Sequence, residues 1–380
     1  MRILHVSAYF APAFRYGGPP RSIHGLCRAL RGRGADVEVF TTDADGGGAL
    51  PPDVTGLREY EGVPVTYFRR SWPPAPIGSR ALAKALREAL RQADVLHIHG
   101  LWNRVVWSAA RAARRAGVPY VLSPRGMLEP AALAHRRIRK RLAWGLVEHR
   151  TVEGAALLHA TSDAEAGTLR ALHPRPEIAL VPNGVELPPA TARGAGEPVI
   201  VFLGRLHAIK RLDLLVDAFA RVRASGRRAE LVIAGPDEGG LRRGLEARVP
   251  AVAGSIAWPG AVDEQGKHEL LARAAALVLC SDSESFGLSA AEAMAAGVPV
   301  VVTRTCPWAD VERHGTGFWV EPHSEAIAGA LMRLLDYPEA ARAMGARGQD
   351  LIERKYRWDV VAAQMERHYR LVAGAGARVA

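Results

Sequence analysis

Residues 283–292 read Ser-Glu-Ser-Phe-Gly-Leu-Ser-Ala-Ala-Glu, and no other stretch constrains the fold and the chemistry of this chain as strongly. An apolar run at 274–280 precedes it and predicts a buried strand, and an Ala-rich helix pattern follows it and stops at Gly297. Glu284 is therefore expected in a strand-to-helix turn, and Glu292 eight residues later in the helix. Amides at a helix start favour phosphate oxygens, and carboxylates accept hydrogen bonds from hydroxyls. This combination would suit a sugar nucleotide.

Strand and helix patterns alternate in two series along the chain. The first predicts strands at 2–7, 36–42, 63–68, 94–99, 119–123, 156–160 and 178–181, and helices near 20–32, 78–92, 104–116, 128–150 and 163–172. The second predicts strands at 199–203, 230–234, 254–258, 275–280, 298–302 and 317–320, and helices near 210–224, 239–248, 263–274, 286–296 and 323–335. Such alternation indicates an α/β protein with parallel sheets covered by helices on both faces. The Pro-, Ala- and Gly-rich segment 186–198 predicts a linker between two Rossmann-like domains that face a cleft.

Composition narrows the class of protein. The 380 residues are 48% hydrophobic, and no apolar run reaches the ~18 residues of a membrane span. A strand pattern begins at residue 2, so no signal peptide is expected. The three cysteines are far apart, which fits a reducing cytoplasm and no disulfide framework.

The positive charge is concentrated in the first half of the chain. The first 190 residues hold 26 Lys and Arg against 16 Asp and Glu, whereas the remaining residues hold 24 against 23. This excess favours an anionic partner. We expect membrane phospholipid or a lipid-diphosphate acceptor rather than nucleic acid.

Two cations follow the first strand of the second series. That strand ends at Gly204, Arg205 comes next, and Lys210 stands five residues later at a predicted helix start. Because a helix start disfavours cations, a ligand-bearing role for Lys210 is expected, and both side chains could neutralise a diphosphate. Arg211 is expected to be a solvated surface charge.

The Glu-x7-Glu spacing after a strand resembles the signature of the retaining glycosyltransferases of family 4, which have the GT-B fold. Matching segments are the Gly-Gly loop at 17–18, Pro-Asn-Gly-Val at 182–185 and Gly-Arg-Leu at 204–206 with Lys210. The resemblance implies an N-terminal acceptor-side domain at 1–186, a donor-binding domain at 198–356, and a helix at 357–373 that returns to the first domain. It also implies a hexosyltransferase (EC 2.4) that moves a sugar from a nucleotide diphosphate sugar to a glycan or lipid-linked acceptor, with retention. The segments 99–102 and 123–127 look like those of enzymes of exopolysaccharide or lipopolysaccharide assembly.

The resemblance, together with the positions of polar residues at strand ends, assigns candidate roles. The candidate catalytic residues are Arg205 and Lys210, on the leaving diphosphate, and Glu284, on sugar hydroxyls. The donor-binding candidates are Gly18, Gly204, Pro236, Val262, Phe286, Gly287, Leu288 and Glu292, the last on the ribose. The acceptor-side candidates are Gly17, His99, Trp102 and Arg125. Many relatives have a histidine near the position of Arg125, and an arginine cannot act as a general base at neutral pH, so Arg125 is expected to bind or orient substrate.

Several alternatives stay open or are set aside. His97 and His99 share a strand face, but no carboxylate stands at a matching spacing, so no metal is expected. Asp43 and Asp45 are expected to form a turn, and no cofactor beyond the donor is expected. A sugar-nucleotide 2-epimerase of the same fold and a non-catalytic carbohydrate-binding protein remain rival functions.

The segment 135–150 has two interpretations. Its basic cluster lies beside Ile138, Leu142 and Trp144, which is the composition of an interfacial helix on anionic lipid. The alternative is an ordinary surface helix that packs these three side chains on its own domain. The protein is accordingly expected in the cytoplasm, either free or associated with the inner face of the membrane.

Overall fold

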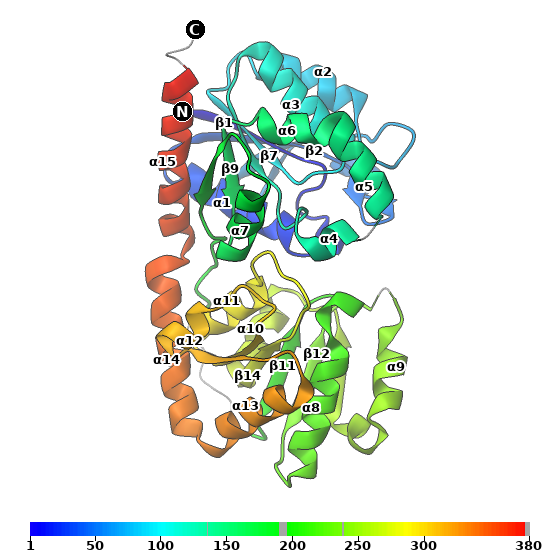
Figure 1. The fold of residues 1–380 in the computed structure, drawn as a ribbon, viewed down its shortest axis with the longest axis vertical. Coiled ribbons are helices and arrows are strands. Elements are labelled where there is room, and N and C mark those ends of the chain that lie inside the picture. The colour runs from blue at the N-terminus through cyan, green and yellow to red at the C-terminus, as the bar shows by residue number, and fades with distance from the viewer. Residues whose placement is uncertain (135, 190–195, 238, 377–380) are drawn as a thin grey trace. The chain divides into compact units, whose positions relative to one another are not determined.

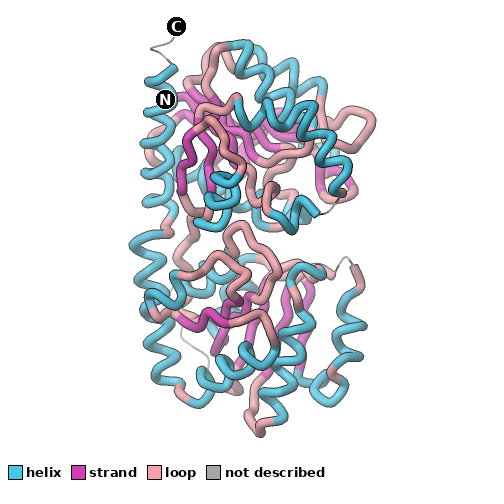
Figure 2. The backbone as a smooth tube through the Cα atoms, in the orientation of Figure 1, coloured by secondary structure: helices cyan, strands magenta, loops and turns pink. Residues whose placement is uncertain are grey.

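The computed structural model describes residues 1–134, 136–189, 196–237 and 239–376. It separates into two compact α/β units, Met1–Gly184 with the C-terminal segment from Trp358, and Val185–Arg357. Each unit has a central sheet with helices around it (Figures 1 and 2). No helix in the described part of the chain has both the length and the apolarity required to cross a membrane.

The first unit is built on an eight-stranded sheet in the order β10-β9-β8-β7-β1-β2-β6-β5. Its strands are β1 (Arg2–Ser7), β2 (Asp36–Thr42), β5 (Gly56–Tyr60), β6 (Val63–Phe68), β7 (Val95–His99), β8 (Tyr120–Ser123), β9 (Leu157–Ala160) and β10 (Glu177–Leu180). All neighbours pair in parallel except β5, which runs antiparallel to β6 at the sheet edge and was not predicted. A short hairpin joins β3 (Ala44–Asp45) to β4 (Gly48–Ala49). The predicted parallel α/β architecture is therefore confirmed, with one antiparallel edge.

The helices of the first unit are α1 (Gly18–Gly32), α2 (Arg80–Ala89), α3 (Arg104–Ala116), α4 (Pro130–Ala134), α5 (Arg137–Ala143), a π-helical turn at Trp144–Glu148, α6 (His149–Glu153), α7 (Asp163–Ala171) and α15 (Trp358–Gly376). The single helix predicted at 128–150 is wrong, because Arg136 has a left-handed backbone (φ +56°) that separates α4 from α5. The last helix, α15, packs on α1. Gly25 permits this contact, since a Cβ there would lie 2.2 Å from the Trp358 ring.

The second unit has a six-stranded parallel sheet in the order β13-β12-β11-β14-β15-β16. Its strands are β11 (Val199–Leu203), β12 (Glu230–Ala234), β13 (Ile256–Gly260), β14 (Ala274–Leu279), β15 (Val300–Thr303) and β16 (Gly317–Val320). Its helices are α8 (Leu212–Ala224), α9 (Leu241–Arg248), α10 (Glu264–Arg273), α11 (Leu288–Ala295), α12 (Asp310–His314), α13 (Ser324–Asp336) and α14 (Pro338–Lys355). Alternate residues of β11 enter two different cores, Val201 on one face and Phe202 on the other, so the sheet is buried on both sides.

Both sheets have a topological switch point, where successive strands are added in opposite directions. In the first unit this point lies between β1 and β7, and in the second between β11 and β14. Loops that leave the carboxyl ends of strands diverge at such a point, and open α/β sheets bind ligands there. Ligand-binding side chains are therefore expected at these two switch points.

Candidate functional site

The switch point of the second unit brings the two central predicted residues into contact. Lys210 ends a short 3-10 turn (Ala208–Lys210) after β11, and Glu284 lies in the loop after β14. The Lys210 ammonium forms an ion pair with Glu284 Oε1, and their side chains are only 20% and 13% exposed. A cation and a hydrogen-bond acceptor therefore stand side by side at the carboxyl edge of the sheet.

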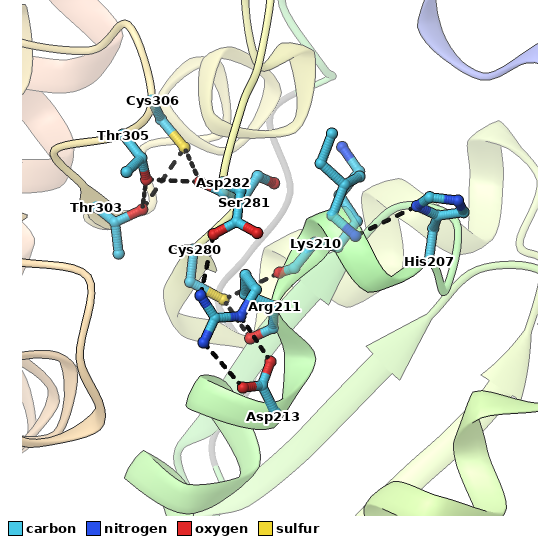
Figure 3. A network of polar contacts seen from close by, with 11 residues as sticks. His207, Lys210, Arg211, Asp213, Cys280, Ser281, Asp282, Thr303, Thr305 and Cys306 are labelled. Atoms are coloured by element: carbon cyan, nitrogen blue, oxygen red, sulfur yellow. Dashed lines mark hydrogen bonds and ion pairs between the residues drawn. The ribbon is translucent and has the colours of Figure 1, made fainter. Parts of the chain in front are cut away.

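A hydroxyl network fixes the Glu284 carboxylate, and Figure 3 shows the part of it that Ser281 and Thr305 form. Ser281 Oγ donates to Glu284 Oε1 at 2.7 Å, and the Ser281 carbonyl accepts a bond from Thr305 Oγ1 at 2.6 Å. Neither Ser281 nor Thr305 was identified from the sequence. Since short hydroxyl side chains in loops carry no periodic signal, only the folded arrangement could reveal them.

Arg211 is not the solvated charge that the sequence suggested. Its guanidinium donates to Asp282 Oδ1 and to Asp213 Oδ2, each at 3.0 Å, and these bonds raise the pKa of Arg211. The residue adopts a left-handed backbone (φ +50°), which is uncommon outside glycine, asparagine and aspartate. Arg211 thus acts as a clamp: it connects Asp213, at the start of α8, to Asp282, in the loop after β14.

This clamp also positions the backbone of Lys210. The Asp282 amide donates to the Ile209 carbonyl at 2.8 Å, and the Cys280 thiol donates to the Lys210 carbonyl at 3.3 Å. The turn that carries Lys210 is therefore attached to the β14 loop on both sides of that residue. These bonds fix the backbone of the turn, and the ion pair with Glu284 orients the Lys210 ammonium.

Helix α11 begins beside this pair with a glycine at its N-cap. Gly287 caps it in a left-handed conformation (φ +84°) and, as a glycine, offers no side-chain acceptor to its first amides. Phe286, 4% exposed, anchors the turn by packing on Trp308 and Tyr356 at ring-centroid distances of 5.2 and 5.8 Å. The first amides of α11, with Leu288 as its first residue, are suited to bind an anion.

Glu292 lies on the second turn of α11 and has a partner that the sequence did not indicate. Lys267 of α10 donates to Glu292 Oε1 at 2.8 Å and also pairs with Glu264 at 2.7 Å. The Lys267 side chain is 15% exposed and the Glu292 side chain 24%. The Lys267 ammonium therefore orients the Glu292 carboxylate through one of its two oxygens.

Main-chain hydrogen bonds connect the loops that follow β11, β12 and β13 at the carboxyl edge of the sheet. The Gly204 amide donates to Ala234 at 3.0 Å, the Leu206 amide to Pro236 at 2.9 Å, and the Gly235 amide to Gly260 at 2.7 Å. Arg205, which is partly buried, lies between Gly204 and Leu206 in the loop that these bonds hold. The Pro236 turn borders that loop, and Val262 follows β13 as a partly buried residue.

The switch point of the first unit contains a buried polar cluster around Arg125. The Arg125 guanidinium donates to Asn183 Oδ1 at 2.7 Å, to Ser22 Oγ at 3.2 Å and to His99 Nδ1 at 3.2 Å. His99 in turn bonds His5 on β1 at 2.9 Å. The structure thus joins the predicted residues His99 and Arg125, and it adds His5, Ser22 and Asn183.

The histidines of this cluster are neutral. Burial lowers the pKa of His5 and of His159 to about 3, and it lowers the pKa of His97 and His99 well below their usual range. Nitrogens of His5, His97 and His99 lie within 4.8 Å of one another, which is close enough for metal ligands. However, His97 is bonded to Tyr369 and Ser123, and the adjacent guanidinium repels a cation. The contacts therefore favour a support for Arg125 over a metal site.

The other predicted residues of the first unit lie in loops at the same sheet edge. Trp102 has a left-handed backbone (φ +62°), donates its indole N–H to Met127 at 3.1 Å, and has the Lys140 ammonium 5.5 Å from its ring centroid. Gly17 (φ +86°) caps α1, and Gly18 is its first residue. Asp43 accepts from Arg70 at 3.2 Å, so this part of the Asp-x-Asp turn has a structural partner.

Comparison with known proteins finds family matches in both units of the chain. Residues 17–184 match the family described as glycosyl transferase 4-like domain, and residues 186–351 match glycosyl transferases group 1. A GDP-mannose:cellobiosyl-diphosphopolyprenol alpha-mannosyltransferase of Komagataeibacter xylinus is 28% identical over 98% of this chain and 94% of its own. A D-inositol 3-phosphate glycosyltransferase of Catenulispora acidiphila is 30% identical over 91% and 88%. HepE of Anabaena, solved with UDP and glucose, has a TM-score of 0.74 at 19% identity, covering 97% and 99% of the two chains, and this likeness confirms the GT-B fold.

Proposed function

The chain belongs to the group 1 glycosyl transferases with a glycosyl transferase 4-like domain, and from this membership we propose that it is a retaining hexosyltransferase acting on a lipid-linked or glycan acceptor. The chain is a glycosyltransferase that uses a nucleotide-sugar donor. The observation that supports the finer assignment is the Lys210–Glu284 pair beside the glycine-capped N-terminus of α11. Diphosphate oxygens bind to the cation and to the helix amides, and sugar hydroxyls donate to the carboxylate.

The proposed mechanism assigns each residue one task. Arg205 and Lys210 neutralise the negative charge that develops on the leaving diphosphate. Glu284 holds sugar hydroxyls, and Glu292, oriented by Lys267, holds the ribose hydroxyls. The reaction that we propose is a front-face reaction, in which the leaving phosphate accepts the proton of the attacking hydroxyl.

The acceptor proposal follows the names of the relatives. The Komagataeibacter relative acts on a cellobiosyl-diphosphopolyprenol, and the Catenulispora relative on an inositol phosphate. We propose a lipid-diphosphate or related glycan acceptor of surface polysaccharide synthesis for this chain, at the cytoplasmic face of the membrane. Incubation with radiolabelled GDP-mannose and UDP-glucose, with and without polyprenyl-diphosphate sugar acceptors, tests this. Conversion of the donor without acceptor would indicate the rival epimerase, and donor binding without any turnover would indicate a carbohydrate-binding protein.

Replacing Glu292 by Gln is expected to weaken donor binding by about 10-fold, because a charge-assisted hydrogen bond to the ribose becomes a neutral one. Isothermal titration with the nucleotide sugar that gives turnover measures this change. Glu339→Gln, at a carboxylate that is 86% exposed on α14, is the matched control and should bind the donor as the wild type does. Equal donor affinity in Glu292→Gln and wild type would remove Glu292 from the proposed site.

A membrane-facing surface accompanies the proposed lipid acceptor. Ile138, Leu142 and Leu146 follow one another at four-residue intervals and are 78%, 62% and 72% exposed. The alternative that Ile138 and Leu142 pack on their own domain is therefore wrong, whereas Trp144 packs near Trp102 with ring centroids 6.4 Å apart. With Arg141 and Gly145, the three apolar side chains line a surface depression.

The charges around this apolar stripe match an anionic bilayer. Arg136, Arg137, Arg139 and Arg141 are exposed around it. Glu148 is the only acid of residues 136–150, and it is buried and accepts bonds from Trp102 and Trp107. An apolar stripe with a basic border binds anionic lipid by burying the stripe and pairing the border with headgroups.

Changing Ile138, Leu142 and Leu146 together to Gln is expected to reduce binding to phosphatidylglycerol-containing vesicles by about 10-fold or more, since ~25 cal/mol is lost per Å² of apolar surface no longer buried. Co-sedimentation with these vesicles and with pure phosphatidylcholine vesicles measures the effect. Leu371→Gln, at a leucine that is 71% exposed on α15, is the control. Unchanged sedimentation of the triple variant would exclude this surface, and loss of a dimer in its place would identify a second copy as the occupant.

A further inference from the structure

Arg125 is a buried cation whose hydrogen-bond partners are all neutral. It is 8% exposed, follows β8 with a left-handed backbone (φ +59°), and donates to an amide oxygen, a hydroxyl and an imidazole. Within the described residues, no carboxylate lies within the 4.0 Å ion-pair distance of its guanidinium. A buried charge without a counter-charge is costly, so a protein retains one where a ligand compensates it.

The nearby acid does not fill this role. Glu165 influences Arg125 electrostatically, but its Oε1 accepts from the Gly126 amide at 2.6 Å and its Oε2 from the Thr161 amide at 2.8 Å. Its carboxylate is therefore committed to the loops after β8 and β9. The guanidinium is left with a net positive charge to be compensated.

Two buried N–H donors of the same cluster also lack an acceptor in the described structure. Arg125 Nε is one of them. His5 Nε2 is the other, because His99 receives a bond from Arg125 at Nδ1 and therefore donates through Nε2 to His5 Nδ1, which leaves the His5 proton on Nε2. Buried donors without acceptors are rare in native proteins and call for an explanation. A ligand with several acceptor oxygens supplies one.

We propose that Arg125 forms an anion-binding subsite at the carboxyl edge of the first sheet and that it takes a phosphate group of a substrate. The subsite lies at the β1/β7 switch point, and Ser22 connects it to α1, whose N-terminus has no side-chain cap. A guanidinium binds phosphate through paired N–H donors. The inference rests on the proposed function for its choice of substrate, since that phosphate belongs either to the lipid-linked acceptor or to the nucleotide donor.

The test measures binding of two probes, farnesyl diphosphate for the acceptor and GDP for the donor, to wild type, Arg125→Met and Arg125→Lys. Loss of one charge-assisted phosphate contact is expected to weaken binding of one probe by about 10-fold or more in Arg125→Met, with partial recovery in Arg125→Lys. Weaker farnesyl diphosphate binding assigns the subsite to the acceptor, and weaker GDP binding assigns it to the donor. Unchanged affinity for both probes would overturn the proposal. This test measures binding and requires no turnover. It therefore distinguishes failure of the Arg125 subsite from failure of the proposed transfer reaction.

Thermal unfolding without ligand separates a binding role from a structural one. Arg125→Met removes an uncompensated buried charge, so its melting temperature is expected to stay within a few degrees of the wild type or to rise. Arg70→Met is the matched control, because it breaks a paired arginine whose side chain is 18% exposed and leaves Asp43 without that partner. This control is expected to melt lower and to bind both probes normally. A large fall in the melting temperature of Arg125→Met, with probe binding retained, would make Arg125 structural.

Discussion

Replacing Lys210 by Ala is expected to lower kcat by roughly 10²–10³-fold, the range found when one preorganised electrostatic contact to a developing anion is removed. The ammonium is oriented by its ion pair with Glu284, and main-chain bonds fix the turn that carries it, so little reorganisation is needed as charge appears on the diphosphate. Steady-state kinetics at saturating donor and acceptor measure the effect. The fall should appear in kcat because this contact strengthens in the transition state.

Two variants make this result specific. Lys355→Ala removes an ammonium that also pairs with a carboxylate, that of Asp310, but it lies on α14 and is 49% exposed, so wild-type kinetics are expected. Lys210→Arg keeps the charge and should retain more activity than Lys210→Ala. A Lys210→Ala enzyme with normal kcat and only a raised KM would show that the residue binds substrate and does not assist departure of the diphosphate.

The parallel-sheet architecture could be predicted because its strands are apolar and short. The predicted bounds of β11, β12 and β16 coincide with the observed ones, since each is an apolar run between turn residues. Strand β5 was missed because its residues 56–60 are mostly exposed at the sheet edge, which leaves no buried face to produce an alternating pattern. Helix α14 was missed because glycines interrupt its apolar period. Gly348 stands there because a Cβ would lie 3.1 Å from Met294 of α11.

The candidate site could be predicted only where its residues lie in local motifs. Glu284 and Lys210 follow strands in recognisable turns, so their meeting at one sheet edge could be anticipated from the parallel topology. Lys267 could not, because it lies on a helix surface 25 residues before its partner Glu292. His5 lies 94 residues from His99 and within an ordinary strand, and only the pairing of β1 with β7 brings the two rings together.

Replacing Gly235 by Ala is expected to lower both stability and donor affinity. Its φ of +153° is unfavourable for any residue with a side chain, and a Cβ there would lie 1.8 Å from the Gly204 carbonyl oxygen. Since both groups are backbone, the Gly204–Arg205 loop must move away. Removing such a fit costs about 2–4 kcal/mol, which corresponds to a fall of roughly 5–15 °C in melting temperature for a domain of this size. Calorimetry and donor titration measure the two effects.

The loop displacement predicts that the two losses occur together. Gly204 and Arg205 are tied to the turn after β12 by the Gly204–Ala234 and Leu206–Pro236 bonds, so a shift at Gly235 moves the cation that we assign to the diphosphate. Gly239→Ala is the matched control, because the nearest contact that its added Cβ makes among the described residues beyond its chain neighbours is Leu241 Cγ at 4.0 Å. That variant should melt and bind donor as the wild type does. A Gly235→Ala protein that melts lower yet binds donor normally would separate the Arg205 loop from donor recognition and remove Arg205 from the proposed phosphate contacts.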